Sequence, residues 1–106
     1  PGACSVLTPN RLAMGGGARM ARDVSTGWAS RGVRVNSFVL AQVMNPGMQQ
    51  RVDRGPRLKE QWLRGLATGR LGTPEDLIGT LLLLLTPGGA FITGQTIYVD
   101  GGRTLV

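Results

Sequence analysis

The sequence predicts an α/β fold with parallel strands, and two stretches of the chain carry that prediction. Residues 11–31 followed by 33–40, and residues 73–86 followed by 95–99, each have the pattern of a helix and then a strand. Repeated units of this kind are the second halves of β-α-β crossovers, which join parallel strands. The 106 residues leave room for one domain, and a hydrophobic content of 42% is typical of a folded chain.

The first helix, over residues 11–31, follows from four apolar residues at helical spacing. These are Leu12, Met20, Val24 and Trp28. The run of three glycines at 15–17 costs about 3 kcal/mol relative to alanines in a helix interior, so we expect it to allow close packing against a neighbouring backbone. It is not a phosphate-binding loop of the G-x-G-x-x-G kind, because the last glycine of that pattern falls on Met20.

The strand over residues 33–40 is apolar and rich in β-branched residues. We assign Asn36 within it a structural role, bonding neighbouring backbone. In the chain alone this strand is expected to expose an unpaired edge. Residues 1–10 have no periodic pattern and are either irregular or the remnant of a strand.

Residues 41–68 form the longest connection and leave the carboxyl end of the first predicted strand. Ligands of open α/β sheets bind beyond that end, so we expect a lid or substrate loop here. One short helix is predicted, over residues 58–66. The predicted breakers around it are Pro46, Gly47, Gly55 and Pro56.

The second helix, over residues 73–86, has clear start signals. Thr73 is a candidate N-cap, and Glu75 and Asp76 place negative charge at the positive end of the helix. Its leucine-rich body is apolar on nearly every face, which predicts burial on more than one side. The strand at 95–99 follows, and we expect Asp100 to organise the turn after it.

Composition narrows the possible functions. The net charge of +6 comes from scattered arginines without interleaved aromatic residues, so nucleic-acid binding is not expected. A surface that binds an acidic partner or an anionic ligand is the next alternative. An ordinary solvated surface is favoured over both. A single cysteine and no histidine exclude an internal disulfide and leave little for a metal site. The leucine run is too short to span a membrane, and we expect a cytoplasmic protein.

Three motifs of the chain are distinctive: WASRGVRVNS at 28–37, GRLGTPEDL at 69–77 and ITGQTIYVDGG at 92–102. In this order and spacing they resemble the carboxyl-terminal half of the short-chain dehydrogenases/reductases. The resemblance implies a partial Rossmann-type domain over residues 1–106 with two parallel strands and flanking helices. The amino-terminal dinucleotide-binding half of the family, with its glycine-rich loop, has no counterpart here. The family uses NAD or NADP, and binding by this chain alone is doubtful.

The resemblance also places the catalytic positions of the family. Counting back from Trp28 puts its tyrosine at Asn10 and its lysine at Met14. An amide has no ionisable proton to give a carbonyl oxygen, and a thioether cannot lower a neighbouring pKa. No catalytic residue is therefore expected within this chain.

Two residues match cofactor-pocket positions of the family. Val43 falls where a backbone group meets the nicotinamide carboxamide, and Asn45 falls where a cofactor-contacting threonine is common. The alternative for both is an ordinary loop with a surface asparagine. Leu40 and Ala41 replace the family's Pro-Gly turn, which puts the shape of that pocket in doubt.

The resulting hypothesis is the carboxyl-terminal portion of an NAD(P)-dependent oxidoreductase for alcohols or carbonyls, inactive as this chain alone. The alternative is a non-catalytic remnant that associates with a full-length relative or another partner through the last strand and Leu81, Leu82 and Leu85. A third alternative is a fragment that results from an incorrect gene prediction and has no independent role. The isolated chain is expected to be marginally stable, partly molten or oligomeric.

Overall fold

The computed structural model describes residues 3–8 and 11–105. The chain forms two compact units, which are described separately. Unit 1 comprises the described parts of Pro1–Leu40 together with Gly79–Tyr98, and unit 2 comprises Ala41–Ile78 with the described residues of Val99–Val106.

The sheet has three strands in the order β1 (Ala3–Thr8), β2 (Arg34–Leu40) and β3 (Thr96–Val99). Strands β1 and β2 pair in parallel, with Ser5 opposite Asn36. Residues 3–8 thus form a strand, which adds a third member to the two expected. The prediction that residues 33–40 expose an unpaired edge is wrong, because β2 is the central strand and the outer edges belong to β1 and β3.

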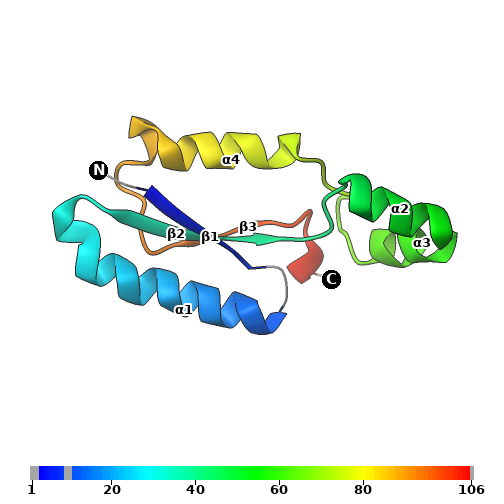
Figure 1. Cartoon of the computed structure of the whole chain (residues 1–106), viewed down its shortest axis with the longest axis horizontal. Helices are drawn as coiled ribbons and strands as arrows, with labels where there is room; N and C mark the ends of the chain where they lie inside the picture. Colours follow the sequence, from blue (N-terminus) through cyan, green and yellow to red (C-terminus); the bar gives the residue numbers. More distant parts are fainter. Residues whose placement is uncertain (1–2, 9–10, 106) are drawn as a thin grey trace. The chain divides into compact units, whose positions relative to one another are not determined.

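Helices cover both faces of this sheet (Figure 1). Helix α1 (Arg11–Trp28) packs on β1 and β2, and the short 3-10 turn η1 (Ala29–Arg31) extends it. Gly32 ends this segment in the left-handed region, with φ of 77°, and its N–H bonds to the carbonyl of Ala29. Side chains of β2 alternate between the two helix-covered faces, which explains why Val35, Phe38 and Val39 are all buried.

The packing predicted for the triple glycine is absent at two of its positions. A Cβ placed on Gly15 or Gly16 would meet no atom within 4 Å, and both residues are exposed. Only Gly17 is buried. The backbone approach expected from the sequence is therefore not made at Gly15 or Gly16 within the described part of the chain.

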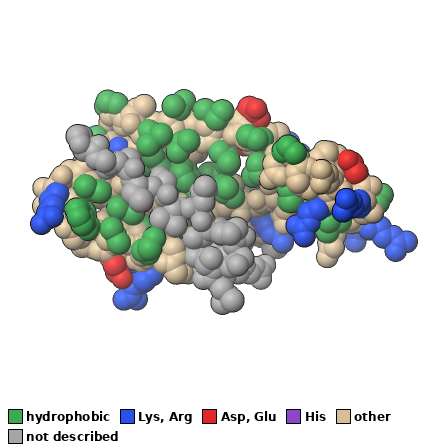
Figure 2. Space-filling model, viewed as in Figure 1, with side chains coloured by type: hydrophobic (Ala, Val, Ile, Leu, Met, Phe, Trp, Pro, Cys, Tyr) green, Lys and Arg blue, Asp and Glu red, His purple; other side chains and the backbone are tan. Residues whose placement is uncertain are grey.

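Helix α4 (Glu75–Leu85) differs most from expectation. Its leucines were predicted to be buried on more than one side, but Leu84 alone among its described residues is buried. Leu82 and Leu85 are each 53% exposed, and Figure 2 shows hydrophobic side chains gathered over α4. Composition reveals an apolar helix but not what covers it, and here only one side of α4 is covered.

Two polar side chains of β2 join distant parts of unit 1. The Arg34 guanidinium donates to the carbonyls of Leu84 and Gly89, both at 2.6 Å. The Asn36 amide donates to the carbonyl of Ile92 and accepts from the N–H of Gln95, both at 3.1 Å. The structural role predicted for Asn36 is confirmed, although its partners lie more than 50 residues away.

Residues 41–68, which belong to unit 2, form two α-helices where one was expected. Helix α2 spans Pro46–Arg54 and helix α3 spans Pro56–Arg64. The prolines that were interpreted as breakers are the first residues of these helices, where a missing N–H costs nothing. Buried apolar side chains of this unit are Val52, Leu66 and Leu71. No helix in the described part of the chain has the length and apolarity needed to cross a membrane.

Candidate functional site

The two positions that match the family's catalytic pair contribute no described side chain. Asn10 lies outside the described residues. Met14 lies within α1, and its side chain is outside the described part of the structure. The candidate site therefore consists of the cofactor-pocket positions, all of which belong to unit 2.

Val43 is held in an extended backbone by Gly72, with which it forms an isolated parallel bridge. The N–H of Gly72 donates to the carbonyl of Gln42 at 3.0 Å, and the N–H of Met44 donates to the carbonyl of Gly72 at 2.8 Å. In a parallel bridge of this pattern the peptide groups of the central residue point away from the partner. Among the described residues, no hydrogen bond engages the N–H or C=O of Val43.

The close approach of the two segments leaves little room at Gly72. A Cβ there would lie 3.2 Å from the Cγ2 of Val43, which is tighter than most contacts, and 3.4 Å from the carbonyl oxygen of Gln42. A side chain at position 72 would therefore require the Val43 side chain to shift by a few tenths of an ångström. Nearby, the side-chain oxygen Oε1 of Gln42 is buried without a hydrogen-bond partner in the described structure.

Asn45 is the N-cap of α2. Its Oδ1 accepts from the N–H of Met48 at 2.9 Å, and its own backbone is extended, as an N-cap requires. The side-chain NH₂ has no partner among the described residues, and Asn45 is exposed. The residue thus has a local structural role and two donors still available.

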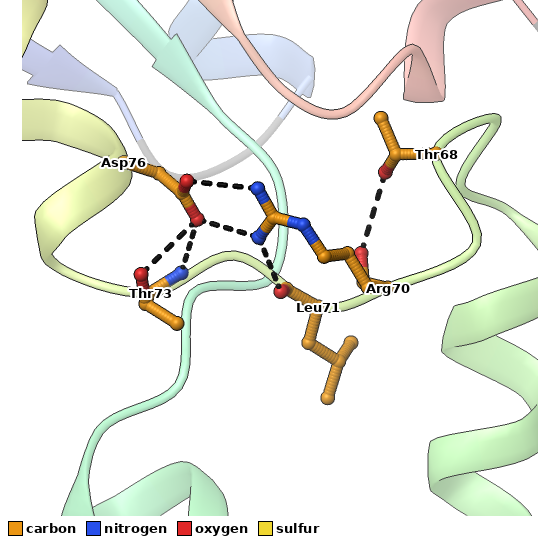
Figure 3. Close-up of polar contacts among 5 residues, drawn as sticks. All are labelled: Thr68, Arg70, Leu71, Thr73 and Asp76. Carbon is orange, nitrogen blue, oxygen red and sulfur yellow. Dashed lines mark hydrogen bonds and ion pairs between the residues drawn. The ribbon is translucent and has the colours of Figure 1, made fainter.

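A compact polar network precedes α4 and fixes the loop that carries Gly72 (Figure 3). The Arg70 guanidinium makes two hydrogen bonds to the Asp76 carboxylate, at 2.7 and 2.8 Å, and a third to the carbonyl of Leu71 at 3.2 Å. Asp76 also accepts from the backbone N–H of Thr73 at 2.8 Å and from its hydroxyl at 3.1 Å. Arg70, Thr73 and Asp76 therefore enclose Gly72 in a closed hydrogen-bonded loop.

Electrostatics reinforce this network. The hydrogen bonds from Arg70 and from the Thr73 N–H hold the pKa of the Asp76 carboxyl well below its usual range. The hydrogen bonds to Asp76 and the negative charge of its carboxylate in turn raise the pKa of the Arg70 guanidinium. Thr73 differs from the prediction in one respect, since its hydroxyl donates to Asp76 instead of capping a backbone N–H, and Asp76 supplies the capping contact in return.

The last strand ends in a turn organised by Asp100, as predicted. Its carboxylate accepts from the N–H of Gly102 at 3.0 Å and from the N–H and hydroxyl of Thr104 at 3.2 and 3.0 Å. The carbonyl of Gly101 accepts from the N–H of Thr68 at 3.0 Å, so this turn supports the segment that leads into Arg70.

Sequence reasoning selected Val43 and Asn45 but missed Gly72, which is bridged to Val43, and Arg70, which holds the loop that carries Gly72. Gly72 is bridged to Val43, whereas no described contact joins Val43 to Asn45 directly. The signal for Arg70 was present in the spacing Arg-x-x-Thr-x-x-Asp, where a capping-box threonine and acid follow a cation by three and six residues.

Comparison with known proteins gives concordant results. The family model described as enoyl-(acyl carrier protein) reductase matches residues 12–104. The 2-(S)-hydroxypropyl-CoM dehydrogenase 3 of Xanthobacter autotrophicus is 35% identical over 97 residues, which are 89% of this chain and 38% of that protein. The galactitol 2-dehydrogenase (L-tagatose-forming) of Cereibacter sphaeroides is 36% identical over 90 residues, 82% of this chain and 34% of the relative.

Solved structures share the fold. An Agrobacterium tumefaciens protein assigned as a 2-deoxy-D-gluconate 3-dehydrogenase, solved with bound NADP, superposes with a TM-score of 0.86 at 18% identity. ElxO with bound NADP also gives a TM-score of 0.86, at 16% identity. Each match covers 98% of this chain and 47% of the solved one. The chain thus spans about a third of its curated relatives and about half of these structures.

Proposed function

This chain belongs to the short-chain dehydrogenase/reductase family, and from that premise we propose that it is the carboxyl-terminal portion of an NAD(P)-dependent oxidoreductase acting on an alcohol or carbonyl substrate. As this chain alone it does not turn over a substrate. The positions that would supply the proton and lower its pKa are Asn10 and Met14, and neither side chain can do so.

The observation that carries the proposal is the free backbone of Val43. The Gly72 bridge holds this residue extended and leaves its N–H and C=O without partners in the described structure. A carboxamide offers both a donor and an acceptor, so an extended residue with both groups free is complementary to it. Val43 is therefore assigned to contact the nicotinamide carboxamide within a complete dinucleotide-binding domain.

Asn45 is assigned a second cofactor contact. Its Oδ1 is used by the cap of α2, so the contact comes from the NH₂ group, which can donate to a carboxamide oxygen or to a pyrophosphate. The proposed substrate is a small alcohol or ketone, and the relatives whose names specify polyol or hydroxyalkyl substrates support this proposal.

A chimera tests these assignments. Residues of the galactitol 2-dehydrogenase up to the position that corresponds to Met14 would be fused before residue 15, supplying the glycine-rich loop, tyrosine and lysine. We expect the chimera to bind NADH or NADPH, measured by enhanced nicotinamide fluorescence. Failure of a folded chimera to bind either nucleotide would contradict the cofactor assignment.

Variants at one position separate the two roles of Asn45. In the chimera, Asn45→Asp keeps the oxygen that caps α2 but removes the NH₂ donors. Nucleotide binding by the chimera should therefore weaken about tenfold while its helicity is unchanged. Asn45→Thr retains both an acceptor and a donor and should preserve binding. Equal affinity for the Asn, Asp and Thr forms would show that the side chain acts only as a cap.

An alternative function is association without catalysis, and the exposure of α4 favours it. Leu81, Leu82 and Leu85 are 40%, 53% and 53% exposed and follow the i, i+1, i+4 spacing of one helix face. Exposed apolar surface of this kind marks a contact site on a soluble protein. In this alternative the face, with the edge of β3, binds a related subunit.

A further inference from the structure

The arginines are spread along the sequence, but helices α2 and α3 carry more than their share of the positive charge. Residues 46–64 contain five cations and two acids, so half of the chain's net charge of +6 lies in 19 residues. All five cations are exposed, and Figure 2 shows Lys and Arg side chains gathered over these helices. This basic arm is formed by Arg51, Arg54, Arg57, Lys59 and Arg64.

In α2 the apolar side is formed by Met48 and Val52, which are one helical turn apart and face the interior of unit 2, where Val52 is 9% exposed. Arg54 lies two residues after Val52, on the opposite side of the helix. Arg51 borders the apolar side, three residues after Met48, and both arginines are exposed.

In α3 the arrangement is the same. Leu58 and Trp62 are four residues apart and half-buried, whereas Arg57 and Arg64 are exposed on the other side. The charged sides of both helices therefore face solvent, and the apolar sides form the packing of the arm.

The two acids of the arm leave most of its charge unpaired. Asp53 accepts a hydrogen bond from the side-chain amide of Gln49 at 2.8 Å, and Glu60 lies 3.9 Å from Arg64 in a loose, exposed ion pair. Within residues 3–8 and 11–105, no ion pair involves Arg51, Arg54, Arg57 or Lys59.

We propose that the basic arm docks an acidic protein surface. Exposed single ion pairs are weak in water, so one small anion gains little from this surface, while several cations acting together steer and hold an extended acidic partner. Nucleic acid fits less well. Asp53 and Glu60 interrupt the positive surface, and Trp62 has its neighbour Leu58 on the half-buried side, so no exposed aromatic residue of the arm is available for base stacking. This inference is independent of the cofactor assignment.

The test uses the 106-residue chain and labelled poly-L-glutamate as the acidic probe, with fluorescence anisotropy at several NaCl concentrations. The variant Arg51→Gln/Arg54→Gln/Arg57→Gln removes three charges from the arm. A matched control, Arg19→Gln/Arg22→Gln/Arg31→Gln, removes three exposed charges from α1 and the η1 turn. We expect the arm variant to bind about tenfold more weakly in 50 mM NaCl and the control to stay within about twofold.

A gain-of-binding variant guards against loss through misfolding. Glu60→Gln removes an acid from the arm and should strengthen poly-L-glutamate binding. Equal losses in the two triple variants, or an unchanged affinity for Glu60→Gln, would overturn the proposal. So would tighter arm-dependent binding of an oligothymidylate probe than of poly-L-glutamate, because the partner would then be nucleic acid.

Discussion

Arg34 offers a direct test of how unit 1 is held together. Its guanidinium donates to the carbonyls of Leu84, in the last turn of α4, and of Gly89 just beyond, so it satisfies acceptors that a helix end leaves without partners. The positive charge also complements the negative end of the helix. Arg34→Met keeps most of the apolar stem and removes both hydrogen bonds.

The expected loss can be estimated from those two contacts. Hydrogen bonds to a charged group contribute about 1.5 to 3 kcal/mol each, and the half-buried position of Arg34 favours the lower end, giving about 3 kcal/mol in total. With a urea dependence of about 1.5 kcal/mol per molar, the unfolding midpoint should fall by about 2 M. Arg34→Lys retains the charge but cannot bridge both carbonyls, so about half of that loss is expected.

Trp28 fluorescence in a Trp62→Phe background reports on unit 1 during urea unfolding, because Trp28 lies at the end of α1. Circular dichroism provides a second probe of the same transition. A midpoint for Arg34→Met within 0.3 M (roughly 0.5 kcal/mol) of the parent protein would refute the assigned role of the two hydrogen bonds.

Three further predictions follow from individual contacts. Gly16→Ala should stabilise the chain by about 0.5 to 1 kcal/mol in urea unfolding, since the added Cβ meets open space within a helix. Gly94→Ala should destabilise it, because φ is 70° and the added Cβ would lie 2.6 Å from the Ser25 hydroxyl. The opposite order of stabilities would show that α1 is not helical at position 16. The pKa of Asp76 is lower in the folded than in the unfolded chain, so its contribution to the free energy of unfolding is complete above about pH 4 and declines as the pH falls below that value. Asp76→Asn should remove this decline. Parallel curves of the free energy of unfolding for the two proteins across pH 2–6 would contradict the network. The double variant Leu82→Gln/Leu85→Gln should reduce self-association in sedimentation velocity without loss of helicity, and unchanged sedimentation of an associating parent protein would exclude this face as the contact.

Local signals in the sequence predicted much of the fold. The prolines, glycines and capping residues bound the helices because each acts through its own backbone geometry. Asp100 formed its predicted turn because its partners, Gly102 and Thr104, lie two and four residues away. Asn36 also has its predicted role, but its partners come from residues 92–95, and no local pattern shows such a pairing.

One failure was local, and the others arose where tertiary structure decides. Pro46 was interpreted as a breaker, yet Asn45 is the N-cap of α2 and Pro46 is its first residue, so the pair begins a helix. The leucines of α4 were predicted to be buried, but most of them are exposed. An apolar helix sequence says nothing about how much surface is available to cover it. The same limit applies to the site, since Gly72 and Val43 are 29 residues apart and meet only when the chain folds.

We propose that this chain is part of a dehydrogenase domain and that its cofactor positions, Val43 and Asn45, do not bind a nucleotide on their own. Calorimetric titration of the purified chain with NADH and NADPH, with light scattering on the same sample, is the first experiment to make. We expect no saturable binding of either nucleotide and a species larger than a monomer. Micromolar binding by a dilute monomer would rule the proposal out, because a complete nucleotide site would then exist without the family's glycine-rich loop.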